Sequence, residues 1–244
     1  MSAAGGAAGG GRAPLPRRVF LDVDIGGHRA AHALAVEFVA KNSLKYGLSS
    51  SVLAELGGSE RARLQELFEN DFAFSSRGAI ALEPAAERVE IELFGAAAPL
   101  AAENFRALCV GDRGKAKGSS VPLCFRGSRL HRLVPGSFVQ GGDFVMGNGA
   151  GGESVYGGVF KDEPAGLKIP LDARGLVACS NTGKHSNGSQ FFITFGPLPK
   201  LNGKHTVFGR VVSGHSVLDA IEAVPCADEK PRAEIVIADC GAMP

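Results

Sequence analysis

The chain has 244 residues, enough for one sizeable domain with additional segments or for two small domains. Hydrophobic residues make up 45% and charged residues 21%, which is typical of a soluble globular protein and argues against intrinsic disorder and fibrous classes. The 26 Lys and Arg nearly balance the 25 Asp and Glu, so we expect neither nucleic acid nor a membrane as partner.

Residues 1–17 are rich in Gly, Ala and Pro and predict a flexible tail. They lack the apolar core of a secretory signal, and no later run approaches the roughly 18 to 20 apolar residues that span a bilayer. The arginines and the lack of acidic residues in this segment leave organellar targeting open. The 5 cysteines form no C-x-x-C pair, which favours a reducing compartment over a disulfide framework or a zinc site. We therefore expect a cytoplasmic protein without a bound metal.

The first expected element is a strand, because Arg18 to Ile25 (RVFLDVDI) alternates apolar and polar residues. Gly26 and Gly27 then indicate a turn that enters a hairpin. One interpretation extends this unit to Phe38 as strand, turn and strand. We favour a single strand followed by an inserted segment, residues 28–87, whose character differs from that of its flanks.

Within the insertion, a helix is expected near Glu60 to Asn70 behind a Ser59 cap. Its apolar residues follow i, i+3, i+4 spacing and are Leu64, Leu67 and Phe68. One functional hypothesis makes this insertion a docking element that attaches the chain to a larger assembly. Because the helix is only modestly amphipathic, a tolerated surface insertion is the favoured interpretation.

A second strand and a helix follow the insertion. Arg88 to Phe94 (RVEIELF) alternates like the first strand, and Pro99 to Val110 predicts a helix with Pro near its start. The expected apolar face of this helix consists of Leu100, Phe105, Leu108 and Cys109.

From Leu123 onward, short alternating segments separated by glycine-rich turns predict further strands: LCFRGSRLHRLV, SFVQGGDFVM, GLVACS, SQFFITF, HTVFGRVV and EIVIADC. Many short strands at such spacing indicate a sandwich or a barrel rather than a parallel sheet. One more helix, Ser216 to Val224, is expected behind a cap at Gly214 or Ser216.

Four ordered motifs resemble the cyclophilin family of peptidyl-prolyl cis/trans isomerases: HRLVPGSFVQGGDF (131–144), NGAGGESVYG (148–157), NGSQFFIT (187–194) and NGKHTVFGRV (202–211). The resemblance covers residues 88–241 and the first strand. It implies a mainly β fold, a closed eight-stranded antiparallel barrel capped by two helices, built from residues 18–27 and 88–244. The groove of such a protein lies on the outer face of the barrel.

The resemblance also implies the site residues, position by position. It gives catalytic roles to Arg132, Gln140 and His205. It gives substrate-binding positions to Phe138, Ser180, Asn181, Thr182, Gln190, Phe192 and Leu201. Among these, Ser180 and Thr182 replace alanines. Two further departures are Ser137, where the family usually has Phe, and Lys200, where it has an aromatic residue.

These residue types suit the chemistry. A peptide bond resists rotation with a barrier of ~18 to 20 kcal/mol. Accelerating a prolyl relaxation of ~10 to 100 s to milliseconds requires roughly 5.5 to 7 kcal/mol. No bond is cut, so no nucleophile, metal or cofactor is expected. Arg132 supplies a fixed charge and a rigid donor fork, which can hold the substrate carbonyl and approach the prolyl nitrogen.

The glycine string from Gly147 to Gly152 imitates a dinucleotide fingerprint, but no helix is expected after it, so we interpret it as a turn-rich loop beside the groove. The expected partners are proline-containing polypeptides, and the expected state is a monomer. Cyclosporin should bind weakly, because the resemblance implies that it needs an indole where Lys200 stands. The alternative function is a binding module, since Ser137 removes an aromatic wall from the pocket and loosens the fit.

A redox hypothesis rests on GDRGKAKGSSVPLC (111–124), which resembles the loop of the divergent cyclophilins. That subgroup pairs two cysteines at the positions of Cys109 and Cys240, although Cys124 and Ser120-Val121 depart from its pattern. In the hypothesis, oxidation joins Cys109 to Cys240 and distorts the groove. The simpler interpretation is that both are buried hydrophobic residues.

Overall fold

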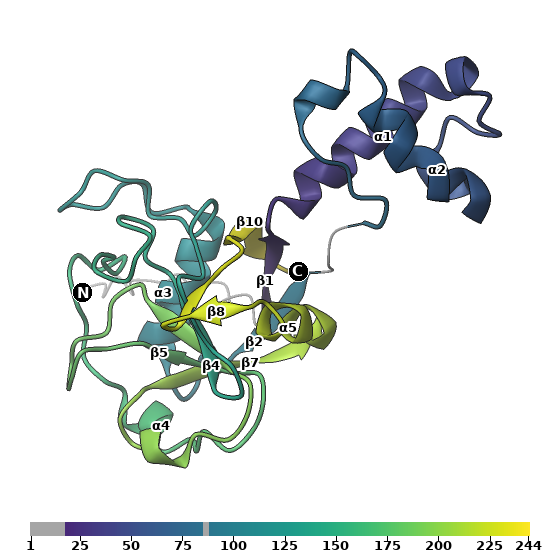
Figure 1. Ribbon diagram of the computed structural model, residues 1–244. Helices are drawn as coiled ribbons and strands as arrows, with labels where there is room; N and C mark the ends of the chain where they lie inside the picture. Colours follow the sequence, from purple (N-terminus) through teal and green to yellow (C-terminus); the bar gives the residue numbers. More distant parts are fainter. Residues whose placement is uncertain (1–17, 85–87) are drawn as a thin grey trace, which may run out of the picture.

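The computed structural model describes residues 18–84 and 88–244 (Figure 1). The predicted tail, residues 1–17, lies outside the described residues. Figure 1 shows a sheet-containing body formed by most of the chain and a small helical unit that stands beside it, joined through β1. Within the described ranges, no helix is both long and apolar enough to cross a membrane.

The body contains one antiparallel sheet in the order β10-β1-β2-β7-β5-β6-β4-β3. Its strands are β1 (Arg18–Ile25), β2 (Val89–Leu93), β3 (Arg132–Val134), β4 (Phe138–Gly141), β5 (Leu176–Cys179), β6 (Phe191–Thr194), β7 (Val207–Ser213) and β10 (Ile235–Ala242). Each strand overlaps a segment whose alternation or apolar run predicted it, although β7 and β10 run one and two residues past theirs, to Ser213 and Ala242. The sheet curves into the mainly β, cyclophilin-like fold that the resemblance implied.

The prediction of a closed barrel is slightly too strong. At the seam, the chain just before β3 meets β10 through an isolated bridge between Arg129 and Val236. Further along, the backbone N–H of Leu133 donates instead to the carbonyl of Glu229 (2.7 Å). Glu229 belongs to the turn of a small hairpin formed by β8 (Cys226–Ala227) and β9 (Lys230–Pro231). The sheet is therefore an open, strongly curved half-barrel, and at Leu133 the hairpin accepts the backbone hydrogen bond that a closing strand would accept.

Two helices complete the body on either side of the strands in Figure 1, α3 (Pro99–Val110) and α5 (His215–Glu222). The ring of Phe105 on α3 packs against three aromatic rings at centroid distances of 4.9 to 5.2 Å: Phe125, Phe191 and Phe208. The helix α5 begins after Gly214, one of its two predicted caps. It buries Val217, Leu218 and Ile221 in the same core. On α3, only Leu100 departs from the predicted apolar face, because its side chain is exposed.

Shorter elements connect the strands. The helix α4 (Pro164–Leu167) follows Glu163, whose buried carboxylate accepts the first free N–H groups of α3 from Leu100 (2.8 Å) and Ala101 (2.9 Å). This contact ties the segment before β5 to α3 and satisfies a helix end that lacks its own side-chain cap. The remaining 3-10 turns are η1 (Leu53–Glu55), η2 (Ser75–Arg77) and η3 (Pro199–Leu201).

The helical unit contains α1 (His28–Tyr46) and α2 (Gly58–Glu69). The predicted hairpin after β1 is wrong: Gly27, with φ of 78°, begins α1 instead of turning into a second strand. The helix predicted near Glu60 is confirmed as α2, but Ser59 is not its cap. The helix starts after Gly57, whose N–H donates to the Glu60 carboxylate (3.1 Å).

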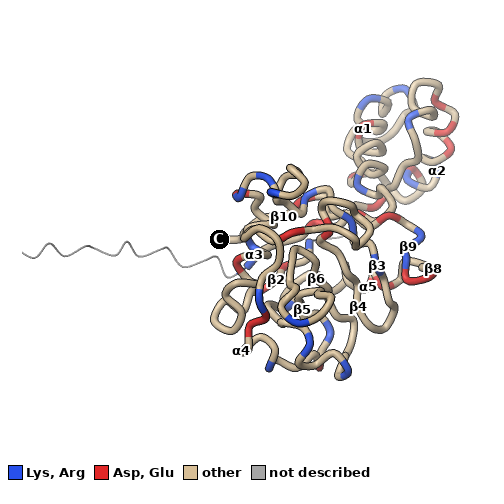
Figure 2. Tube along the Cα trace, turned by 90° about the vertical axis from the view of Figure 1, so that its left-hand side faces the viewer, with Lys and Arg blue, Asp and Glu red and all other residues tan. Residues whose placement is uncertain are grey.

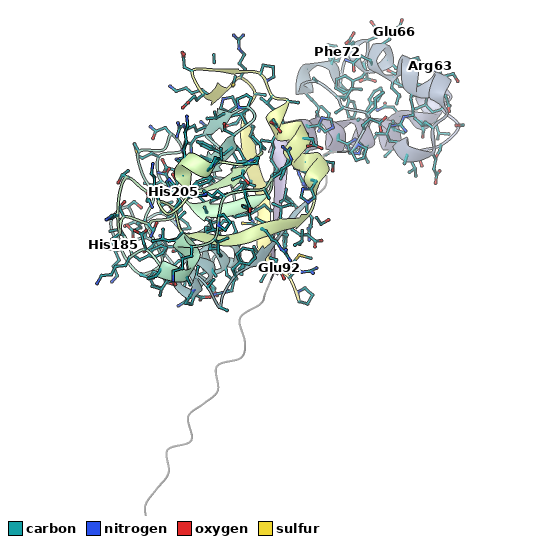
Figure 3. All side chains as sticks on the ribbon, turned by 90° about the horizontal axis from the view of Figure 1, so that it is seen from below. Arg63, Glu66, Phe72, Glu92, His185 and His205 are labelled. Atoms are coloured by element: carbon teal, nitrogen blue, oxygen red, sulfur yellow. The ribbon has the colours of Figure 1, made fainter. Side chains whose placement is uncertain are left out.

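A separate small core holds this unit together. The ring of Phe38 on α1 packs against Phe68 (5.3 Å) and Phe74 (5.2 Å) in edge-to-face geometry. Figure 3 shows Phe72 on the same unit, and its side chain is 98% exposed.

Basic and acidic residues are interspersed over both parts of the molecule (Figure 2). The division of the chain into a barrel domain and an insertion stays an interpretation, although the two cores are distinct.

Candidate active site

Strand register places three predicted site residues in one row across the sheet. Arg132 on β3 lies opposite Gln140 on β4, and Gln140 lies opposite Phe192 on β6. The neighbouring row is buried in the main core and consists of Leu133, Val139 and Ile193. Because successive strand residues point to opposite faces, Arg132, Gln140 and Phe192 share the outer face of the sheet.

The polar half of the site is a chain of hydrogen bonds. Arg132 Nη1 donates to Gln140 Oε1 (3.4 Å), and Gln140 Nε2 donates to Gln190 Oε1 (2.9 Å). Gln190 Nε2 in turn donates to the carbonyls of Gly149 (2.9 Å) and Gly151 (2.8 Å). This chain of hydrogen bonds fixes the side-chain amides of Gln140 and Gln190 and aligns one edge of the Arg132 guanidinium with them.

The loop that receives Gln190 is folded around a buried carboxylate. Asp143 is fully buried, and it accepts five backbone N–H groups, from Val145, Met146, Asn148, Gly149 and Gly151. Burial raises the pKa of Asp143, but the N–H donors, led by those of Met146 and Gly151, outweigh burial and leave this pKa below its usual value. The glycine string is thus a turn-rich loop beside the groove, and its N–H groups serve the protein's own carboxylate.

The apolar half of the site lies on the same outer face. The ring centroids of Phe138 and Phe192 are 5.4 Å apart, and Leu201 packs against the same small cluster, which is distinct from the main core. The guanidinium carbon of Arg132 lies 5.1 Å from the centroid of the Phe138 ring. The half-buried ring of Phe138 therefore lies beneath the arginine with the buried ring of Phe192 beside it, and a proline ring could rest there while its carbonyl faces the charge.

His205 packs edge-on against Phe192, with ring centroids 5.2 Å apart, and is labelled on the body of the protein in Figure 3. Its Nδ1–H donates to the carbonyl of Cys179 (3.0 Å). Burial lowers the pKa of His205 below 6.5, so the imidazole is neutral near pH 7. A neutral, hydrogen-bonded imidazole suits a packing and orienting role at the pocket rim better than a charged one.

The residues around Asn181 border an open groove of about 390 Å³. Six predicted site residues line this groove: Arg132, Gln140, Ser180, Asn181, Thr182 and Gln190. The Asn181 side-chain amide donates to the carbonyl of Lys204 (3.1 Å), next to His205. Of the ten predicted catalytic and binding residues, nine fall in the groove or in the adjacent apolar cluster, and the tenth, His205, packs against Phe192 of that cluster. The pairing of Gln140 with Phe192 joins the groove to the cluster.

The positions that depart from the family pattern are also at this site. Ser137 precedes β4, and its carbonyl accepts the N–H of Phe195 (2.7 Å), so the backbone is anchored although the aromatic wall is missing. Lys200 is exposed on η3, one residue before Leu201. Sequence reasoning missed Glu229, whose carboxylate accepts a hydrogen bond from Arg132 Nε (2.7 Å). No local pattern around Glu229 points to this contact, which joins residues 97 positions apart.

The five cysteines are free thiols. Cys124 lies near both Cys109 and Cys240, because its thiol adds to burial in raising the pKa of each. Burial raises the pKa of Cys109 well above its ordinary value and raises that of Cys240 to about 12. The disulfide between Cys109 and Cys240 stays a prediction. Among residues 18–84 and 88–244, no cluster of three or more His, Cys, Asp or Glu is arranged to hold a metal ion.

The fold and the site define a class of protein: a curved antiparallel sheet whose outer face carries an arginine and two glutamines beside an apolar cluster with two aromatic rings. The family model described as "Cyclophilin type peptidyl-prolyl cis-trans isomerase/CLD" matches residues 79–242. The chain belongs to this family. The match begins after β1, α1 and α2 and includes every predicted catalytic and binding residue.

Curated relatives match the same part of the chain at 46 to 48% identity. The chain is 48% identical over 157 residues to "Peptidyl-prolyl cis-trans isomerase cyp11" of Rhizopus delemar, which covers 64% of this chain and 46% of that protein. It is 46% identical over 157 residues to the "NK-tumor recognition protein" of Mus musculus and to that of Homo sapiens, covering 64% of this chain and 11% of each. The chain thus spans less than half the length of these relatives.

Proposed function

We propose that this chain is an active peptidyl-prolyl cis/trans isomerase that acts on Xaa-Pro bonds of protein substrates. The observation that carries the proposal is the row formed by Arg132, Gln140 and Phe192 on the outer face, which places a permanent positive charge beside an aromatic pocket. The family binds proline-containing peptides as substrates. Folding and conformational switching of such clients are the roles that this activity would serve.

The proposed mechanism is electrostatic. Rotation about the prolyl bond requires loss of amide resonance, which localises a lone pair on the prolyl nitrogen and leaves the carbonyl oxygen free to rotate. With the proline ring on Phe138 and Phe192, the guanidinium of Arg132 would approach that nitrogen, while Gln140 would steady the arginine. Hydrogen-bond donors that are already oriented by the protein need not be reorganised when the transition state forms.

The groove beside Asn181 would hold the residues that precede proline. Its lining is mainly polar and contains backbone groups of the glycine-rich loop as well as the side chains of Ser180 and Thr182. An extended peptide fits an open channel of this kind, since it offers its own N–H and C=O groups as partners. Ser180 and Thr182 add hydroxyls to this channel, and the Thr182 hydroxyl already donates to Ser186 Oγ (3.3 Å).

A second candidate function is a proline-binding module with little catalysis. Ser137 favours it, because a serine beside Phe138 provides less contact for the ring in the transition state. Exchange NMR on a proline-containing peptide separates the two functions: an isomerase speeds cis/trans exchange, whereas a binder shifts peaks without doing so. Absence of catalysed exchange at saturating protein, with binding retained, would overturn the first proposal.

We propose a cytoplasmic, monomeric protein, and the cytoplasmic setting is supported only by the composition. We also propose weak affinity for cyclosporin, because Lys200 stands where the resemblance implies an indole. The helical unit offers a second surface through which the chain could attach to an assembly. Deleting residues 28–84 and comparing both isomerase activity and co-purifying partners tests whether that unit serves docking.

A further inference from the structure

The β8–β9 hairpin contains an unfavourable residue at its tip. Its two loop residues are Asp228 and Glu229, and both have positive φ, 50° and 61°. A two-residue hairpin loop with positive φ at both positions is the type I′ turn, which favours glycine at the second position. Glu229 therefore occupies a position where the backbone alone would favour glycine.

The side chain of Glu229 makes a specific contact there. Its Oε2 accepts the Nε–H of Arg132 at 2.7 Å, and its own carbonyl accepts the N–H of Leu133 at 2.7 Å. The turn is thus attached to β3 at two consecutive residues, once through the backbone and once through the carboxylate. Glu229, Arg132 and Gln140 all border a second hollow of about 260 Å³ beside the groove.

We propose that Glu229 is a positioning residue for the isomerase reaction, acting by holding the guanidinium of Arg132 through its Nε edge; this inference rests on the proposed function. With Nε engaged, the two Nη nitrogens are left for Gln140 and the substrate. The guanidinium is then held from both sides, by Glu229 and by Gln140. Such restraint lowers the cost of aligning the arginine with the prolyl nitrogen.

A surface ion pair without functional consequence is the competing explanation, because both side chains are about half exposed, 43% for Arg132 and 50% for Glu229. Exposed pairs stabilise proteins weakly. That explanation can be tested because the turn favours glycine at position 229. If the ion pair had no functional role, glycine there would remove the unfavourable backbone conformation and leave kcat/KM unchanged.

The experiment compares Glu229→Gly and Glu229→Gln with the wild type by exchange NMR, and measures melting temperature in parallel. Glu229→Gly removes the carboxylate from a turn that tolerates glycine, so we expect the fold to persist and kcat/KM to fall about fivefold, equivalent to about 1 kcal/mol. Glu229→Gln can still accept the Nε–H, so it should retain most of the activity. Asp228→Gly is the matched control, since it changes the same turn and should leave kcat/KM unchanged.

Two further readouts separate positioning from a structural effect. In an Arg132→Ala background, Glu229→Gly should change kcat/KM no further, because the two residues act through one contact. Raising KCl from about 0.02 to 0.5 M should shrink the difference between wild type and Glu229→Gly, since an exposed pair is screened. Unchanged or increased kcat/KM in Glu229→Gly, with wild type active and Arg132→Ala impaired, overturns this inference alone. An inactive wild type would overturn the proposed function instead.

Discussion

The ring of Phe192 stands edge-on to the imidazole of His205, with centroids 5.2 Å apart and planes at 89°. The imidazole is also fixed by its hydrogen bond to the carbonyl of Cys179. Both contacts fix the position of His205 beside Phe192, and burial, which outweighs the hydrogen bond to Cys179, lowers its pKa and makes this residue sensitive to acid.

Acidification should destabilise the protein through His205. Burial lowers the pKa of His205 in the folded protein below its usual 6.5, so the unfolded chain binds its proton first as the pH falls. The free energy of unfolding is therefore retained above about pH 6.5 and decreases below it, until the folded form also becomes protonated. Melting temperatures between pH 7.5 and 5 should fall less steeply for His205→Asn. A residual slope is expected from His131, whose pKa burial also lowers. Identical profiles for the two proteins would contradict this assignment.

Replacing Arg132 should remove most of the isomerase activity. Arg132→Ala deletes the preorganised charge, and loss of one such donor typically costs about a hundredfold to a thousandfold in rate. Arg210→Ala is the matched control, because Arg210 is an exposed arginine on β7 that pairs with Glu92 (2.8 Å), outside the groove. Exchange NMR and a melting curve measure both variants. Full activity in a folded Arg132→Ala protein would show that another group carries catalysis.

The sequence predicted much of the body because its strands alternate and its helix signals are local. The helix predicted from Pro99 and the apolar spacing after it has the same first and last residues as α3, Pro99 and Val110. The helix α1 was missed, although its buried residues Ala35, Phe38 and Val39 follow helical spacing, because Gly26 and Gly27 favoured a hairpin. Instead the Asp24 carboxylate accepts the N–H of Arg29 (3.0 Å) near the start of the helix.

The candidate site was predictable only through the resemblance. Phe192 is nearly fully buried and by pattern alone belongs to a core, since nothing in β6 indicates that its outer face is lined by η3 and His205. The contact between Arg132 and Glu229 depends on where a hairpin near the C-terminus docks. Contacts between residues so far apart in the sequence depend on tertiary packing, which local sequence patterns do not encode.

The helical unit should be destabilised by Phe38→Ala without loss of isomerase activity. Phe38 is fully buried among Phe68, Phe74 and Tyr46, and truncation of such a ring costs about 3 to 5 kcal/mol. Phe72→Ala is the control, because its side chain is 98% exposed and should leave stability unchanged. Hydrogen exchange should show faster exchange in residues 28–84 only. A comparable loss of activity would mean that this unit supports the groove.

Cyclosporin affinity should depend on residue 200. The chain contains 0 Trp, and Lys200 is exposed beside Leu201 at the pocket rim. Lys200→Trp should raise affinity at least tenfold, equivalent to about 1.4 kcal/mol. Calorimetry measures the change, with Lys168→Trp as an exposed lysine away from the groove. Tight binding by the unmodified protein would show that the indole is not required.

The last prediction concerns oxidation of the cysteine cluster. A thiolate is the species that reacts with oxidants, and raised pKa values keep Cys109 and Cys240 protonated at neutral pH. Cys109 is also 1% exposed, so oxidants reach it poorly. We therefore expect a mild dose of hydrogen peroxide at pH 7 to leave both thiols reduced and the isomerase activity unchanged, as the interpretation of buried hydrophobic residues requires.

Disulfide mapping by mass spectrometry, with activity measured before and after reductant, decides between this interpretation and a redox switch. Cys124 must be followed as well, because its thiol lies near that of Cys240 and is an alternative partner to Cys109 for a disulfide. A disulfide between Cys109 and Cys240, accompanied by reversible loss of activity that Cys109→Ser abolishes, would establish the switch. A disulfide between Cys124 and Cys240 that leaves activity unchanged would instead show that the thiols are reactive but separate from the groove.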